Sequence, residues 1–213
     1  MHQSTPAPAG QGNQRERIVD AMIESCAAKT YAATTITDIV AGARISRTTF
    51  YKQFDDKREC FDAAVAHCLD LLREAGGTAH TPDEPPGDAV RKACAAVLEA
   101  MADRPGLAQL MAVDAIAVDP AAVERYRAAT IPALEALWAD DGVAPVRHLD
   151  PRLAFGQAQV LILNELATGR PDRLPELLPE LVYLAVSPFG GHGEAIKQAG
   201  LARQGVPSGA PSR

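Results

Sequence analysis

Residues 34–65 read TTITDIVAGARISRTTFYKQFDDKRECFDAAV, and their pattern indicates how the N-terminal part of the chain folds. Thr35 stands three residues before Asp38, so the hydroxyl and the carboxylate can cap each other's backbone amides at the start of a helix. That helix is short, because Gly42 favours its end. Ser46 offers a second N-cap hydroxyl, and another short helix is expected directly after it. Two short helices about three residues apart predict a helix-turn-helix.

Helices with apolar stripes are predicted before and after this stretch. The first helix is predicted over residues 14–29, where apolar residues recur at helical spacing. A fourth helix is predicted to begin near residue 56, because Asp56 and Glu59 repeat the capping pattern before a long apolar stripe. The apolar residues of the helix-turn-helix are expected to meet in a three-helix core; they are Ile36, Ile39, Ile45, Phe50 and Phe54.

These residues resemble the DNA-binding signature of the TetR family of repressors. The resemblance lies in T-T-I-x-D-I followed by S-R-x-T-F-Y-x-x-F-x-x-K. It implies an all-α fold of about nine helices, with an N-terminal three-helix helix-turn-helix DNA-binding domain and a C-terminal helical domain for ligand binding and dimerisation. The expected boundaries are a disordered tail at 1–13, the helix-turn-helix domain at 14–74, the effector-binding and dimerisation domain at 75–197 and a flexible tail at 198–213.

The resemblance further implies that residues 46–52 form a recognition helix that lies in the major groove. By their chemistry, Arg47 and Lys52 can donate to guanine edges or phosphates, and Thr48 can contact a thymine. Lys57 and the first-turn amides of its helix can hold a phosphate. The alternative to a DNA-binding role is that these are solvated polar residues on a short helix. The expected DNA-binding residues are Thr35, Arg44, Ser46, Arg47, Thr48, Thr49, Tyr51, Lys52 and Lys57.

Charge gives contrary evidence, because the formal net charge is −6 and the pI is near 5.4. Residues 1–75 hold nine Lys or Arg and ten Asp or Glu, so the domain expected to bind DNA is not basic as a whole. Residues 44–58, however, hold five cations against two acids, a local excess of three. Screening acts over roughly 8–10 Å, so a local excess can attract phosphate while remote acids are screened.

Two positions depart from the pattern of the family. Arg44 stands in the turn where the family usually has glycine, which tolerates a positive φ, so the turn is expected to be strained or reshaped. Arg44 is also a candidate phosphate contact. Cys60 stands where a larger aliphatic residue is common, which predicts a looser contact of the fourth helix.

Beyond residue 87, helices are predicted near 88–103, 105–117, 120–140, 150–168 and 176–187, after a long loop at 76–87. Pro132 is expected to kink or break its helix. By the resemblance, the last two long helices form a four-helix interface with a partner. The candidate interface residues are Leu153, Val160, Leu163, Leu178, Leu181, Val182 and Ala185. The candidate effector-pocket residues are Met101, Met111, Tyr126, Trp138, Phe155, Gln159 and Asn164.

The expected function is a ligand-responsive transcriptional regulator, a repressor by resemblance, that binds a palindromic double-stranded DNA operator as a homodimer and is released by a small hydrophobic or aromatic effector. We expect no cofactor, no metal, no enzymatic activity and no membrane partner. We expect the protein to be cytoplasmic. The four cysteines form no C-x-x-C pair and predict buried thiols. Two alternatives stay open: a helical ligand-binding or scaffolding protein that no longer reads DNA, and an enzyme with a helix-turn-helix-like module.

Overall fold

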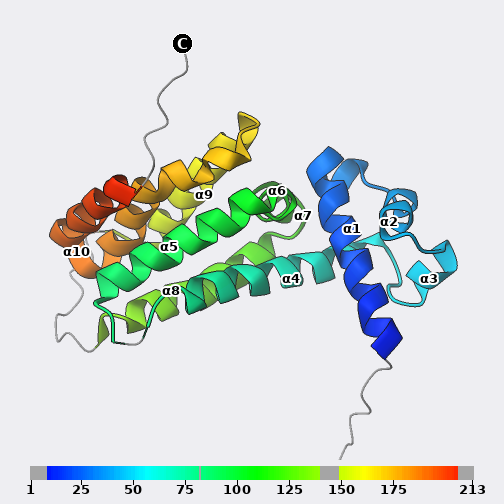
Figure 1. Cartoon of the computed structure of the whole chain (residues 1–213), viewed down its shortest axis with the longest axis horizontal. Coiled ribbons are helices and arrows are strands. Elements are labelled where there is room, and N and C mark those ends of the chain that lie inside the picture. Colours follow the sequence, from blue (N-terminus) through cyan, green and yellow to red (C-terminus); the bar gives the residue numbers. More distant parts are fainter. Residues whose placement is uncertain (1–8, 82, 140–148, 206–213) are drawn as a thin grey trace, which may run out of the picture.

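The computed structural model describes residues 9–81, 83–139 and 149–205, and within these ranges every regular element is a helix. Figure 1 shows an elongated molecule in which α1–α3 form a lobe at one end, here called the head. Helices α5–α10 form the rest, here called the body, and α4 runs from the head along it. The elements are α1 Ala9–Ala33, α2 Ile36–Ala43, α3 Arg47–Tyr51, α4 Lys57–Thr78, α5 Pro86–Asp103, α6 Pro105–Gln109, a π-turn Leu110–Asp114, α7 Ala115–Val118, α8 Pro120–Ala136, α9 Pro151–Ala167, a 3-10 helix Pro171–Leu177 and α10 Leu178–Gly205.

The predicted caps set the boundaries of the short helices. At α2, the Thr35 hydroxyl accepts from the Asp38 N–H, and the Asp38 carboxylate accepts from the Thr35 N–H at 2.8 Å. Asp56 caps α4 through the Glu59 N–H at 2.8 Å. Such caps satisfy amides that have no partner inside the helix. The predicted capping box is therefore confirmed at α2, whereas at α4 the Asp56 cap forms but the Glu59 carboxylate accepts from the Asp55 N–H instead of the Asp56 N–H.

One apolar core joins the head to α4 and to the near end of the body. Phe50, Phe54 and Ile39 are buried, as predicted, while Ile36 and Ile45 are half-buried against the same cluster. Cys26, Cys60 and Cys68 are buried and Cys94 is half-buried. Burial raises the pKa of each thiol to about 12. These cysteines are thus packing residues that stay protonated.

Residues 105–118, here called the joint segment, form a helical path made of α6, the π-turn and α7. If the joint segment is counted as one helix and the 3-10 helix is left out, the described ranges contain nine helices, in agreement with the expected number of about nine. The joint segment packs closely on α1, because a Cβ on Gly106 would lie 2.9 Å from Ile23 Cγ2. Leu107, Ala108 and Leu110 are also buried there.

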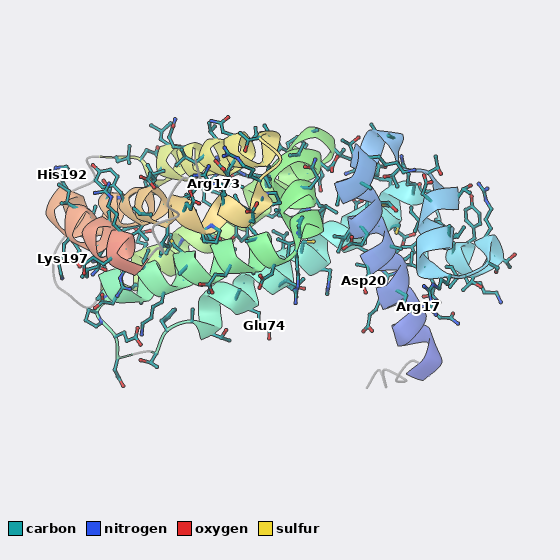
Figure 2. The ribbon with its side chains drawn as sticks, turned by 45° about the horizontal axis from the view of Figure 1, so that its top comes forward. Arg17, Asp20, Glu74, Arg173, His192 and Lys197 are labelled. Carbon is teal, nitrogen blue, oxygen red and sulfur yellow. The ribbon has the colours of Figure 1, made fainter. Side chains whose placement is uncertain are left out.

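The C-terminal helix differs from the prediction, because α10 extends to Gly205 and breaks at Gly191, where φ is 75°. A residue without a side chain adopts this left-handed conformation most readily. The segment after the break lies along α5 through Gln198, which is fully buried and accepts from Arg91 Nε at 3.0 Å. Figure 2 shows His192 and Lys197 of this segment at the end of the molecule opposite Arg17.

Several boundaries predicted from sequence are therefore wrong. The expected flexible tail at 198–213 is helical as far as residue 205, and residues 206–213 lie outside the described ranges. The expected disordered tail at 1–13 is helical from residue 9, and residues 1–8 lie outside the described ranges. The loop expected at 76–87 is shorter, because α4 continues to Thr78 and α5 begins at Pro86.

Pro132 does not break its helix, because α8 continues to Ala136. Among the described residues no single helix meets the length and apolarity needed to cross a membrane. The pair formed by Pro105–Val118 and Pro120–Ala136 meets those criteria only when both parts are taken together across a 117° bend.

Candidate nucleic-acid interface

Helix α3 is held on one side and exposed on the other. Its N-cap is Ser46, whose Oγ accepts from the Thr49 N–H at 3.0 Å. Phe50 on its inner side is fully buried. On the outer side Arg47, Thr48, Tyr51 and Lys52 are exposed, as the sequence predicts. A short helix fixed through one face can present the other to a duplex.

Two side chains of α3 are arranged by their neighbours. The Arg47 guanidinium lies 6.0 Å from the centroid of the Tyr51 ring. The Thr49 hydroxyl lies 2.9 Å from Ser46 Oγ and is only half-exposed, so it takes part in the cap. Arg47 and Tyr51 therefore present their polar groups together, whereas Ser46 and Thr49 mainly shape the helix.

Arg15 supports the end of α3 and was not singled out by sequence reasoning. Its guanidinium lies 4.2 Å from the centroid of the Phe54 ring and donates to the Gln53 carbonyl oxygen at 3.0 Å. The interaction combines a cation–π contact with a hydrogen bond to the turn after the helix. The remaining donors of this exposed guanidinium add positive charge beside α3.

The turn between α2 and α3 keeps the left-handed geometry that glycine usually supplies. Arg44 is the C-cap of α2, with φ 53° and ψ 49°. Its N–H donates to the Ala41 carbonyl, and Arg17 of α1 donates to the carbonyl oxygens of Ala43 and Arg44. The sequence left two outcomes open, a strained turn or a reshaped one. The turn keeps the left-handed geometry and is therefore strained at Arg44. The Arg44 side chain is exposed beside α3.

The Lys57 side chain makes its contacts within the protein. Its Nζ donates to the carbonyl oxygens of Tyr31 at 3.0 Å and Thr34 at 2.9 Å, and it lies 4.1 Å from the centroid of the Tyr31 ring. Two of its three N–H donors are thereby engaged. Its first role is to anchor the end of α1 to the start of α4.

Arg58 contributed to the local charge excess counted from the sequence, yet it also faces the protein. Its guanidinium donates to Asp62 at 2.8 Å and to the Val118 carbonyl at 3.1 Å, and lies 3.9 Å from Asp119. Of the five cations in residues 44–58, Arg44, Arg47 and Lys52 are therefore left beside the turn and α3. Arg15 and Arg17 of α1, which lie outside that stretch of sequence, add positive charge at the same place.

Thr35 is exposed, but its hydroxyl donates to Asp38 Oδ2 at 2.7 Å, so it serves the cap of α2. Asp38 also pairs with Lys29 at 2.7 Å. Hydrogen bonds from Lys29 and Thr35 lower the pKa of Asp38 to about 2. The start of α2 is thus fixed by a charge network that remains ionised at neutral pH.

The structure does not gather the expected effector-pocket residues around one space. Tyr126 and Phe155 pack together with ring centroids 5.6 Å apart, and Met101 and Met111 are buried in the main core. Trp138 instead stacks on Phe189 in a second cluster. Gln159 is half-buried and Asn164 is exposed.

The expected dimer residues divide in the same way. On α9, Leu153, Val160 and Leu163 are 63%, 48% and 36% exposed. On α10, Leu181 and Val182 are buried inside their own chain, so their assignment to an interface is wrong. Leu178 and Ala185 are half-buried against the same two clusters.

A groove of about 500 Å³ runs between α9 and α10. The sequence reasoning missed most of its wall, because the side chains come from both halves of the broken α10. Ile196, which lines it, is 53% exposed. The lining residues are Gln157, Leu161, Pro179, Glu180, Tyr183, Leu184, Ile196, Ala199 and Arg203.

Comparison with solved structures agrees with this architecture. The fatty acid degradation regulator FadR from Bacillus halodurans has a TM-score of 0.65 at 17% identity, covering 86% of this chain and 97% of its own. A TetR family regulator from Marinobacter aquaeolei has a TM-score of 0.66 at 15% identity, covering 84% and 97%. PfmR from Thermus thermophilus, also of the TetR family, has a TM-score of 0.59 at 22% identity, covering 87% and 97%. At these identities the likeness establishes the fold.

The sequence of the head matches a known protein family. The model for bacterial regulatory proteins of the tetR family matches residues 18–64, which run from α1 into α4 and include the whole helix-turn-helix. No curated protein matches the sequence significantly. The head is therefore a helix-turn-helix DNA-binding domain of the tetR family of bacterial regulatory proteins, and the helical body has the fold of solved TetR family regulators.

Proposed function

We propose that this regulator binds a palindromic operator as a homodimer and is released by a small apolar or aromatic effector. The observation that carries the DNA part is the exposed row Arg47, Thr48, Tyr51 and Lys52 on a helix anchored through buried Phe50. Arg47 is assigned to a base edge, because a guanidinium matches the two acceptors of guanine. Lys52, Tyr51 and Arg44 are assigned to phosphates.

Selection of bound sequences from random duplexes tests this assignment. A palindromic or near-palindromic consensus is expected, because a two-fold dimer presents two α3 helices. Arg47→Ala is expected to lower affinity and to relax the choice of base at one position in each half-site, by about 1–3 kcal/mol. Arg73→Ala, which removes an equal charge from an exposed site on α4, is the control. A folded Arg47→Ala protein with unchanged selectivity would favour a helical protein that no longer reads DNA.

The dimer is proposed to form over the groove between α9 and α10. The two helices that line the groove carry exposed apolar side chains, Leu153, Val160 and Leu163 on α9 and Ile196 and Leu201 on α10, and exposed apolar patches mark protein interfaces. Two-fold packing of these helices would bury Val160 and Ile196 against the partner. Val160→Glu is expected to shift the protein to monomer in analytical ultracentrifugation and to weaken operator binding. Ile116→Glu, at an apolar residue 38% exposed on α7, should leave both unchanged. A dimeric Val160→Glu protein would refute this interface.

The effector site is proposed around Tyr126 and Phe155, where aromatic rings from α8 and α9 meet. Burial raises the pKa of Tyr126, which fits a hydroxyl in apolar surroundings. A panel of aromatic compounds and long-chain fatty acids tests the site; the fatty acids are included because of the likeness to a fatty acid degradation regulator. An effector should raise the melting temperature, release the operator and lose its effect in Tyr126→Ala. A ligand that still acts on Tyr126→Ala would place the site elsewhere.

A further inference from the structure

Tyr31, at the end of α1, is held from two directions. Its N–H donates to Asp114 Oδ1 at 2.8 Å, and its carbonyl oxygen accepts from Lys57 Nζ at 3.0 Å. Asp114 belongs to the joint segment of the body, and Lys57 opens α4. The backbone of one residue therefore connects the head to the body and to the helix that links them.

The chain is strained next to this point. Thr30 has φ 70° and ψ 160°, a region that is nearly restricted to glycine, although it is β-branched. Thr34 closes the turn, because its hydroxyl donates to the Thr30 carbonyl at 2.8 Å and its own carbonyl accepts from Lys57 at 2.9 Å. Strain of this kind persists only where surrounding contacts hold it.

The π-turn Leu110–Asp114 places Asp114 against α1. A π-turn contains one residue more than a regular helical turn, and one residue of α-helix corresponds to a rotation of about 100°. In a regular α-helix, Asp114 would therefore leave the direction of the Tyr31 amide. The π-turn itself packs against α1, α4 and α9. A rearrangement at α9 can thus reach the head through this turn.

Asp114 is an unfavourable residue for packing alone. It is 4% exposed, and its Oδ2 has no hydrogen-bond partner within the part of the chain that is described. Burial raises the pKa of Asp114, and the Tyr31 N–H and the Gln109 side chain only partly oppose this effect. An asparagine would accept the same amide without a buried charge. The hydrogen bond to the Tyr31 amide, and not apolar packing, therefore explains a polar side chain at this buried position.

We propose that Asp114 is a positioning residue for DNA binding: its bond to the Tyr31 amide fixes the angle of the head on the body. In a dimer that angle sets the separation of the two α3 helices. The inference rests on the proposed function, because only a protein that uses two heads at once depends on their separation. It adds a residue from the body, 83 positions from Tyr31, to those that determine operator affinity.

The test compares Asp114→Ala and Asp114→Asn with Asp103→Ala, which changes an exposed carboxylate of the body. Each protein is measured on the full selected operator and on a duplex with a single half-site. Asp114→Ala should lower full-operator affinity about tenfold, within the usual range of coupling between sites. Its half-site affinity should stay unchanged, because the head is intact. Asp114→Asn should bind as the wild type does, because its Oδ1 still accepts from Tyr31.

Hydrogen exchange at the Tyr31 amide gives a second measurement that does not involve DNA. The amide should exchange faster in Asp114→Ala and at the wild-type rate in Asp114→Asn. Equal losses on half-site and full operator, or a folded Asp114→Ala protein with wild-type affinity for the full operator, would overturn the inference. If the wild-type protein selects no sequence at all, the proposed function fails, whereas the amide exchange still reports whether the Asp114 bond holds the end of α1.

Discussion

Replacing Arg44 with glycine should stabilise the protein and at the same time weaken its electrostatic attraction to DNA. Arg44 has φ 53° and ψ 49°, and the left-handed conformation costs a residue with a side chain about 1–2 kcal/mol. Glycine removes this cost but loses more backbone freedom on folding, by about 0.5–1 kcal/mol. At the middle of both ranges the net gain is about 0.75 kcal/mol, and for a chain of this size it corresponds to a rise in Tm of about 1.5–3 °C. The backbone bond from residue 44 to the Ala41 carbonyl, 3.2 Å long, is retained.

The effect on DNA is measured by the salt dependence of operator affinity. Each phosphate contact contributes a slope of about 0.9 in log K against log salt concentration, so the loss of one contact per head should reduce the slope by about 1.8 in a dimer. Arg44→Ala is the matched control, because it removes the same charge but keeps a Cβ in the left-handed turn. Its slope should fall equally, without the gain in Tm.

Two results would refute this reasoning. A lower Tm for Arg44→Gly would mean that the arginine side chain contributes more to stability than its backbone conformation costs. An unchanged salt slope in both variants would mean that Arg44, although exposed beside α3, contacts no phosphate.

Further predictions concern caps, packing and pH. Ser46→Ala should lower the free energy of unfolding by about 1 kcal/mol in a denaturant titration, and Ser46→Gly by only a few tenths; equal losses would contradict a capping role. Gly106→Ala should lower Tm, because its Cβ would lie 2.9 Å from a side-chain methyl of α1, whereas Gly77→Ala, with nothing within 4 Å, should not; equal behaviour would exclude a tight contact. Asp38 stabilises the fold above its ordinary pKa of 3.8, and this stabilisation should be lost as the pH falls towards the folded pKa of about 2, but not in Asp38→Asn. Asp114 has the opposite sign, because its pKa is raised in the folded state: Asp114→Asn should gain most Tm near neutral pH and progressively less as the pH falls towards the pKa of an ordinary carboxyl group.

The head could be predicted well because its signals are local. Thr35 and Asp38 are three residues apart, and Ser46 caps an amide three residues on, so the sequence itself determines both helix starts. The burial of Phe50 follows from helical spacing in the same stretch.

The direction of the cations at the start of α4 could not be predicted in this way. Lys57 bonds a carbonyl 26 positions away and Arg58 one 60 positions away, so their partners exist only after the chain has folded. The same holds for Asp114, which meets Tyr31 across 83 positions. The extent of α10 was missed because its glycines and proline suggest a chain end, whereas Gly191 is a bend between two helical halves.

The second half of α10 has a practical consequence for anyone who shortens this protein. The final residues look dispensable by composition, yet a chain cut before Gln198 would deprive Arg91 of its amide acceptor and remove Ala202, which packs in the same cluster as fully buried Val90. Apolar side chains of α5 such as Val90 would then be exposed to solvent, beside the Arg91 guanidinium, which would have lost one of its hydrogen-bond acceptors. Such a trimmed protein is expected to aggregate, even though no residue of the DNA-reading head has been touched.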